Sequence, residues 1–354
     1  MAEPVAEEAL RELLAAPSLR RLAIAGLAKN VGKTTLLGAV AARLQAAGEP
    51  VGFVSIGVDG ERLDGLSGAA KPPVVLAAGD LAVTAERSLG EAECGPELLS
   101  RLGVRSVLGE LFLVRATRPG RLVLAGVRFR SDVALAVDAL RGAGAARVLI
   151  DGAFDRLMAA SPGLCDGVLL ATGMAVADQP DAVALRTAEV VARFALPVAP
   201  EAWWRAAGDG GLVGWCEGVA ALLAAPSLLS DEATQALRTA RPERLFAPGA
   251  FSERAAALLL GLGKDGPREV VVTDATHVMV TEAMQRRLAK AGVMISVARS
   301  VPLLAVAYNP TRPEGGGVPS EQLCAALSSR LPAGLLLWDV AGSKLHRAGG
   351  SGEV

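Results

Sequence analysis

The segment RLAIAGLAKNVGKTT, residues 21–35, contains the strongest indication of the fold and function of this chain. Its first six residues form an apolar run typical of a buried parallel strand. From Lys33 onward, apolar residues recur at the spacing of a helix. The loop between them ends in Gly32, Lys33 and Thr34, the end of a Walker A motif. The segment therefore predicts a strand that delivers a phosphate-binding loop into a helix.

Each residue type in this loop suits a phosphate site. A glycine at position 32 allows the backbone to approach an anion, and the amides at the start of a helix attract negative charge. Lys33 is expected to meet the β- and γ-phosphates and to act in catalysis, and the Thr34 hydroxyl is expected to ligate Mg²⁺. The predicted nucleotide contacts are Gly26, Lys29, Asn30, Val31, Gly32, Lys33, Thr34 and Thr35.

Two features separate this loop from standard forms of the motif. The five-residue spacing expects a glycine at position 27, where Leu27 stands, and the nearest glycine is Gly26. Lys29 precedes Lys33 by four residues, whereas the signature lysine of deviant Walker A loops precedes it by five. Lys29 is therefore interpreted either as a lysine that acts on a second copy of the chain, which would form a homodimer, or as a solvated loop residue.

A magnesium nucleotide site also needs an acidic group. Asp151 ends the apolar run RVLID, and a carboxylate at the carboxyl end of a central parallel strand can reach the metal's water shell. Asp59 follows the next predicted strand after the loop and is expected to order Mg²⁺ or the attacking water; a solvated Asp-Gly turn is the alternative. Asp151 and Asp59 are thus predicted as catalytic and metal-binding residues.

Composition limits the remaining classes of function. The net charge of −1 gives no reason to expect nucleic-acid or membrane binding. The four cysteines lie far apart and the chain has two histidines, which disfavours a disulfide framework or a histidine metal centre. The acidic N-terminal segment does not resemble a signal peptide, and we expect a cytoplasmic protein. The guanine motif N-K-x-D is absent, so ATP is favoured over GTP.

Alternating apolar strands and helices predict an α/β fold, with a mostly parallel P-loop NTPase sheet covered by helices on both faces. A change in composition predicts a P-loop domain over residues 1–228. A second, smaller α/β domain is expected over 229–342, followed by a disordered tail over 343–354. The segments after residues 273 and 308 are expected to rim one crevice in that second domain.

The chain resembles SIMIBI-type P-loop proteins in the loop KNVGKTT, in SIGVDGE after the second strand and in the strand that ends at Asp151. Over nearly its whole length, through GLAKNVGKTT, IDGAFDR, LLATG and AVAYNPTRPEG, it is similar to the small reactivase subunits associated with adenosylcobalamin-dependent lysine 5,6-aminomutase. This resemblance implies ATP turnover that helps release damaged cobalamin from the aminomutase, with a MutS-like ATPase as a further partner.

Three functions agree with these features. The first is an NTP hydrolase that couples Mg-nucleotide turnover to remodelling or reactivation of a partner enzyme. The second is an ATP-dependent ligase or synthetase of the dethiobiotin synthetase type, whose substrate the second domain or the Asp59 loop holds. The third is a nucleotide-binding scaffold without hydrolysis, which the unusual Leu27 keeps open.

Overall fold

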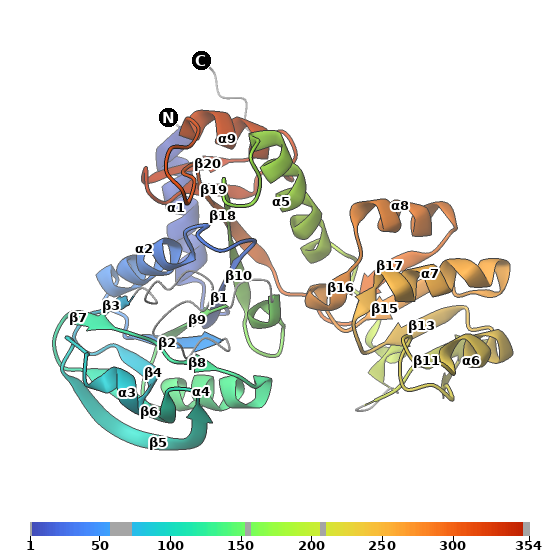
Figure 1. Cartoon of the computed structure of the whole chain (residues 1–354), viewed down its shortest axis with the longest axis horizontal. Helices are drawn as coiled ribbons and strands as arrows, with labels where there is room; N and C mark the ends of the chain where they lie inside the picture. The colour runs from blue at the N-terminus through green and yellow to red at the C-terminus, as the bar shows by residue number, and fades with distance from the viewer. Residues whose placement is uncertain (1, 57–72, 153–156, 206–209, 350–354) are drawn as a thin grey trace. The chain divides into compact units, whose positions relative to one another are not determined.

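The strand that precedes the predicted phosphate-binding loop, residues 26–35, which is called the phosphate loop below, lies near the middle of a large mixed sheet (Figure 1). The computed structural model describes residues 2–56, 73–152, 157–205 and 210–349. The strands at the centre are parallel, and antiparallel pairs occur towards both edges. In spatial order the strands are β20 (Lys344–Arg347), β19 (Leu336–Asp339), β18 (Leu303–Asn309), β10 (Gly167–Gly173), β1 (Arg21–Gly26), β9 (Arg147–Asp151), β2 (Val51–Ile56), β4 (Leu81–Ala85), β6 (Gly109–Ala116) and β5 (Pro96–Ser106), with β8 (Gly126–Val127) also paired to β2.

Helices cover both faces of this sheet because its central strands are apolar on both sides. Phe53 belongs to the core cluster that contains Leu36 and Leu37 of α2, whereas the neighbouring Gly52 lies against Leu140 of α4. Successive strand residues point to opposite faces, so α2 and α4 cover opposite faces of the sheet. The helices of this unit are α1 (Ala2–Ala15), α2 (Lys33–Ala46), α3 (Glu86–Leu89), α4 (Arg130–Gly142), α5 (Pro180–Phe194) and α9 (Ser320–Ser328), and a small sheet pairs β3 (Val74–Leu76) with β7 (Gly120–Leu122).

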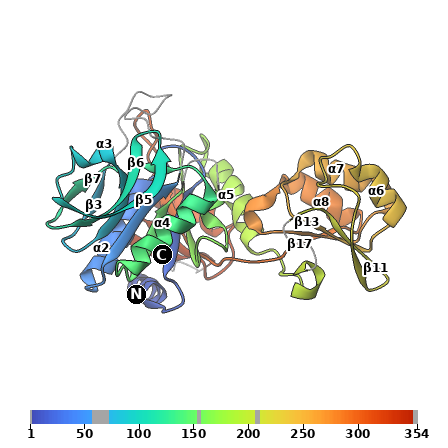
Figure 2. The same cartoon turned by 90° about the horizontal axis from the view of Figure 1, so that it is seen from below.

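Residues 189–300 form a second compact unit around a five-stranded mixed sheet. The helices α6, α7 and α8 pack on one face of this sheet in a shared apolar core (Figure 2). Trp203 and Trp204 pack against apolar residues of the other face. The strands are, in spatial order, β12 (Val219–Leu222), β11 (Val213–Cys216), β13 (Arg244–Ala247), β15 (Glu269–Val272) and β17 (Met294–Val297), the helices are α6 (Ala233–Ala240), α7 (Glu253–Leu262) and α8 (Glu282–Lys290), and β14 (Phe251–Ser252) pairs with β16 (Val278–Met279).

These observations confirm the predicted α/β fold with a large, mostly parallel sheet and a second, smaller unit. The units are divided differently from the prediction: residues 1–188 and 301–354 form the first, so the second is an insertion and does not follow residue 228. The reason is that β18 pairs with β10 and β19 pairs with β18, which returns the chain to the large sheet. A buried parallel strand looks the same in sequence whichever sheet it joins.

The predicted disordered tail is wrong at its start. Residues 344–347 form β20, which pairs antiparallel with β19, and Leu345 of this strand is buried in the main core. Residues 350–354 lie outside the described part of the chain. None of the helices in the described ranges has the length and apolar character that crossing a bilayer requires.

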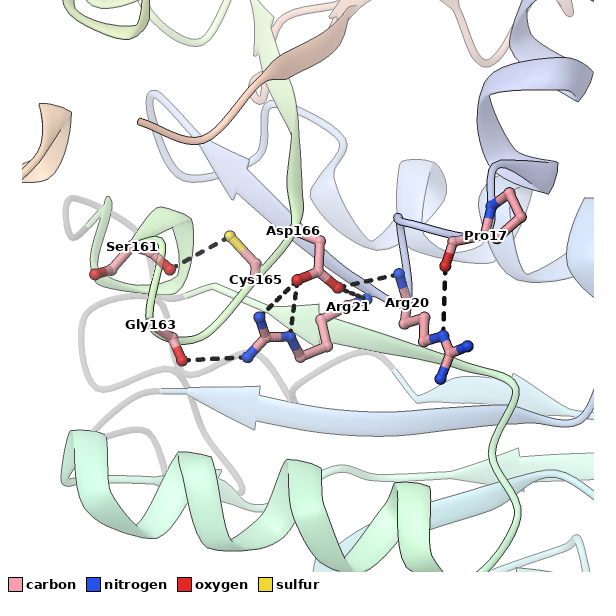
Figure 3. Close-up of polar contacts among 7 residues, drawn as sticks. All are labelled: Pro17, Arg20, Arg21, Ser161, Gly163, Cys165 and Asp166. Carbon is pink, nitrogen blue, oxygen red and sulfur yellow. Dashed lines mark hydrogen bonds and ion pairs between the residues drawn. The ribbon is translucent and has the colours of Figure 1, made fainter. Parts of the chain in front are cut away.

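An ion pair fixes the beginning of β1, the strand that carries the phosphate loop. The Arg21 guanidinium donates two hydrogen bonds to the Asp166 carboxylate, at 2.6 and 3.1 Å, and one to the carbonyl of Gly163 (Figure 3). The other oxygen of Asp166 accepts the backbone amides of Arg20 and Arg21. Asp166 immediately precedes β10, so this carboxylate joins the starts of two adjacent strands.

Burial of Asp166 opposes its ionisation, but the hydrogen bonds and charge of Arg21 outweigh burial and lower the pKa of this carboxyl below its usual value. The same hydrogen bond raises the pKa of the Arg21 guanidinium. A carboxyl group with a lowered pKa in the folded state stabilises the fold above its unfolded pKa near 3.8. This stabilisation is lost as the pH falls through the folded-state pKa.

We expect Asp166→Asn to lower the free energy of unfolding at pH 7 by about 1–2 kcal/mol, because the ion pair with Arg21 is lost. The effect stays moderate because both side chains are partly exposed to solvent, which weakens the pair. Urea unfolding at pH 7 and at pH 3 measures this effect. The difference between variant and wild type should shrink at pH 3, because the Asp166 carboxyl of the unfolded wild type, with its pKa near 3.8, is largely protonated there and part of the stabilisation is lost. A difference that is equal at both pH values would contradict the role assigned to the charge.

Candidate phosphate-binding site

The phosphate loop runs from the end of β1 at Gly26 to the start of α2 at Lys33. Two of its residues have left-handed backbone conformations, Asn30 with φ 61° and Gly32 with φ 89°. Glycine and asparagine are the residue types that adopt this conformation most readily. The carbonyl of Gly32 accepts the hydrogen bond of Leu36, so the helix begins directly after the loop.

Gly26, at the end of β1, packs closely against the side chain of Lys33. A Cβ atom at this position would lie 2.6 Å from both Cγ and Cδ of Lys33, so only glycine lets the lysine stem cross the end of β1. The next residue, Leu27, donates its backbone amide to the carbonyl of Ala171 on β10 at 3.0 Å. The shift of the glycine from position 27 to 26 is therefore compatible with a lysine that folds back over the loop.

Lys33 connects the loop to the adjacent strand β9. Its Nζ donates a hydrogen bond of 2.8 Å to the carbonyl of Gly152, the residue that follows β9. The backbone amide of Gly152 in turn donates to the carbonyl of Ile24 at 2.9 Å. The ammonium group is thus held between the carboxyl ends of β1 and β9.

Asp151 ends β9 in the same cross-strand row as Ile24 of β1 and Ser55 of β2. Neighbouring strands lie about 4.8 Å apart, so Asp151 is one strand from the start of the phosphate loop. The Ser55 hydroxyl donates to Oδ2 of Asp151 at 3.2 Å. Lys33, Asp151 and Ser55 therefore meet at one edge of the sheet.

The other predicted residues lie in the same loop and at the start of the helix. Val31 is buried and fixes the loop to the core, Lys29 and Thr34 are half-buried, and Thr35 is exposed on the first turn of α2. Asp59 lies outside the described residues. In the described ranges, no three His, Cys, Asp or Glu side chains come together to hold a metal ion.

Oxygen ligands that could hold Mg²⁺ do lie close to the phosphate loop. The Thr34 and Ser55 hydroxyls and the Asp151 carboxylate are all oxygen donors at the carboxyl edge of the sheet. Magnesium commonly takes one or two such protein ligands and completes its shell with water and substrate phosphates. The residues present therefore fit a metal that arrives together with a phosphate ligand.

A cavity of about 580 Å³ lies at the connection between β10 and α5. It is lined by residues 174–179, by Ala182 and Arg186 of α5, and by Pro313 and Glu314 from the segment after β18. The Arg186 side chain fixes this wall by a 2.6 Å hydrogen bond to the carbonyl of Val176. Its volume is in the range of small-molecule sites.

Thr172, which precedes this cavity at the end of β10, does not face a ligand. Its hydroxyl is buried and lies 2.8 Å from that of Thr187 on α5, which itself donates to the carbonyl of Val183. The Thr172 hydroxyl therefore joins the end of β10 to α5.

The expected crevice in the second domain is not present. Asp274 accepts hydrogen bonds from Thr276 and His277 and caps the short helix Ala275–His277, which belongs to the second unit. Asn309 belongs to the first unit, where its side chain contacts the phosphate loop. The two segments therefore do not rim one crevice within either unit.

Two contacts of the site were not predicted from the sequence: that of Ser55 with Asp151 and that of Asn309 with the loop. Ser55 carries a detectable signal, because it is a polar residue in an otherwise apolar, fully buried strand. The Asn309 contact depends on a pairing across nearly the whole chain, for which the sequence holds no local signal.

Comparison of the chain with protein-family models, with curated proteins and with solved structures finds no match.

We expect Gly152→Ala to destabilise the protein by about 1–3 kcal/mol. The new Cβ would lie 2.9 Å from the carbonyl oxygen of Ile24 and 3.2 Å from Cβ of Ala159, and a backbone atom cannot move away without shifting β1. The midpoint of urea unfolding measures the effect.

Gly38→Ala is the matched control for Gly152→Ala. Gly38 is exposed within α2 and has open space at its Cβ position, so alanine should raise stability by about 0.5–1 kcal/mol. Equal effects of the two substitutions would show that the junction of β1 and β9 is not tightly packed.

Proposed function

We propose that this chain is a P-loop NTPase that binds Mg-ATP at the loop from Gly26 to Thr35 and hydrolyses it. The observation that carries this proposal is the position of Lys33, held between the loop and the residue after Asp151. A cation and an acid at adjacent strand ends, above a helix N-terminus, are the groups that phosphoryl transfer requires.

Phosphate binding is supported by the backbone at the start of α2. The left-handed Gly32 leads into the helix, whose first amides lack partners within the helix and attract anions. The first turn of α2 contains Lys33 and has no acidic residue that would repel a phosphate. The Lys33 ammonium would exchange the carbonyl of Gly152 for the β- and γ-phosphate oxygens, which are stronger acceptors.

The metal would be held by the Thr34 hydroxyl and, directly or through water, by Asp151. When bound, Mg²⁺ neutralises charge that develops on the phosphate oxygens. The Ser55 hydroxyl donates to Asp151 and so helps to fix the orientation of this carboxylate. The alignment of Asp151 with Ile24 keeps this carboxylate one strand from the loop.

The nucleoside would occupy the cavity between residues 174–179 and Glu314. This cavity and the phosphate loop both lie at the carboxyl ends of neighbouring parallel strands, β10 and β1, where ligands bind in open α/β sheets. Asp178, Gln179 and Glu314 supply hydrogen-bonding groups for a base or ribose. ATP is proposed rather than GTP because the chain has no N-K-x-D motif.

We further propose that nucleotide turnover acts on a partner protein. The second unit, residues 189–300, begins within α5, ends before β18 and has its own apolar core, so it is suited to contact a partner. The resemblance to the reactivase subunits makes an adenosylcobalamin-dependent aminomutase the candidate partner, together with a MutS-like ATPase. ATPase activity that rises when such an aminomutase is added would support this assignment.

Lys33→Ala should weaken ATP binding about 10- to 100-fold, because a charge-assisted hydrogen bond to phosphate is lost. Calorimetric titration of wild type and variant with ATP and with GTP, each with Mg²⁺, measures this loss and the preference between bases. Lys290→Ala, which removes an exposed lysine from α8, is the control and should bind like wild type. The proposal is wrong if the wild type binds neither nucleotide.

Asp151→Asn should raise the Mg²⁺ concentration needed for half-maximal ATP hydrolysis by about tenfold or more, because the amide is a weaker metal ligand than the carboxylate. Phosphate release measured over a series of Mg²⁺ concentrations shows this shift. Asp231→Asn, at an exposed position of the second unit, should leave the Mg²⁺ requirement unchanged. An unchanged requirement in Asp151→Asn would remove this residue from the metal site.

A further inference from the structure

Asn309 is the last residue of β18 and stands two strands from β1 in the large sheet. It is paired in register with Gly173, the last residue of β10. The carboxyl ends of β1, β10 and β18 therefore bring together the phosphate loop, the start of the cavity wall and Asn309. Nothing in the function proposed above uses this side chain.

The side chain of Asn309 donates a hydrogen bond to one left-handed residue of the phosphate loop, Asn30, and lies near the other, Gly32. Its Nδ2 donates to the carbonyl of Asn30 at 3.4 Å. A Cβ atom at Gly32 would lie 3.7 Å from Cβ of Asn309, which is ordinary van der Waals contact. Asn309 thus lies against the part of the loop whose backbone must turn to present amides to an anion.

The same residue is bound to both walls of the cavity. Its backbone carbonyl accepts the amide of Met174 at 2.9 Å, and a Cβ at Gly173 would lie 2.3 Å from that oxygen. Its side-chain Oδ1 accepts the amide of Thr311 at 3.0 Å and the Thr311 hydroxyl at 2.7 Å. Met174 lines one wall, and the Thr311 turn leads directly into Pro313 and Glu314 on the other.

The two walls are also joined to each other near Asn309. The Arg312 guanidinium donates to the carbonyl of Asp178 at 3.0 Å, and Thr311 forms a bridge with Gly317 that closes the turn. A ligand between Asp178 and Glu314 would contact both segments at once. Its binding free energy would thereby hold the Thr311 turn, which orients the Asn309 amide.

We propose that Asn309 is a positioning residue that makes phosphate binding at the loop depend on occupation of the cavity by a nucleoside. This inference rests on the function proposed above. A ligand in the cavity would fix Thr311, whose amide donates to Oδ1 of Asn309 and so orients the side-chain amide. The Nδ2 group of that amide then holds the carbonyl of Asn30 in the loop. A nucleoside and a phosphate ligand should therefore bind with positive coupling.

The test measures pyrophosphate affinity by calorimetry, with Mg²⁺, in the absence and presence of saturating adenosine; a parallel series uses guanosine. In the wild type, adenosine should tighten pyrophosphate binding about fivefold or more. Asn309→Asp keeps the Oδ1 acceptor for Thr311 but loses the donor to Asn30, so the ratio should fall to about one. The charge that this substitution adds acts on both measurements and cancels in the ratio.

Asn309→Ala provides a second variant that adds no charge, and Gln322→Ala, which removes an exposed amide from α9, is the control that keeps the wild-type ratio. Circular dichroism and the unfolding midpoint establish that each variant is folded. A wild-type ratio of one, or an unchanged ratio in both Asn309 variants, overturns the coupling while the nucleotide site stands. A wild type that binds neither pyrophosphate nor ATP overturns the proposed function itself.

Discussion

The hydrogen bond from Lys33 to the carbonyl of Gly152 is the contact on which the arrangement of the site depends. It joins the first residue of α2 to the residue after β9, and so connects the phosphate loop to the strand that carries Asp151. The glycine at position 26 is what allows the lysine stem to reach across β1. The phosphate loop with Lys33 and the acid Asp151 are distant in sequence, and this contact brings them together at the carboxyl ends of adjacent strands.

Polar interactions at both ends of β1 define its position, while its middle is apolar. Arg21 and Asp166 fix the beginning of the strand, and Gly152 fixes its end through the carbonyl of Ile24. A fully buried strand has no side-chain polarity that would specify its register, so these end contacts supply it. The position of the loop that follows β1 is determined accordingly.

The sequence was sufficient for the elements whose signals are local. The loop from Gly26 to Lys33, the acid at Asp151 and the α/β class follow from short patterns, and the structure confirms that class. The return of the chain at β18 could not be predicted, because an apolar run does not state which sheet it joins. The same limit concealed Asn309, whose partner Asn30 is 279 residues away.

The second unit joins the first at two elements that line or contact the candidate site. The chain leaves the large sheet through α5 and returns through β18. These are the elements that carry the cavity wall at Arg186 and the side chain of Asn309. The polypeptide of the insertion is therefore continuous with both walls of the proposed nucleoside cavity, and Asn309 links it to the phosphate loop by a hydrogen bond. That connection requires no contact between the two units, because the polypeptide itself provides it.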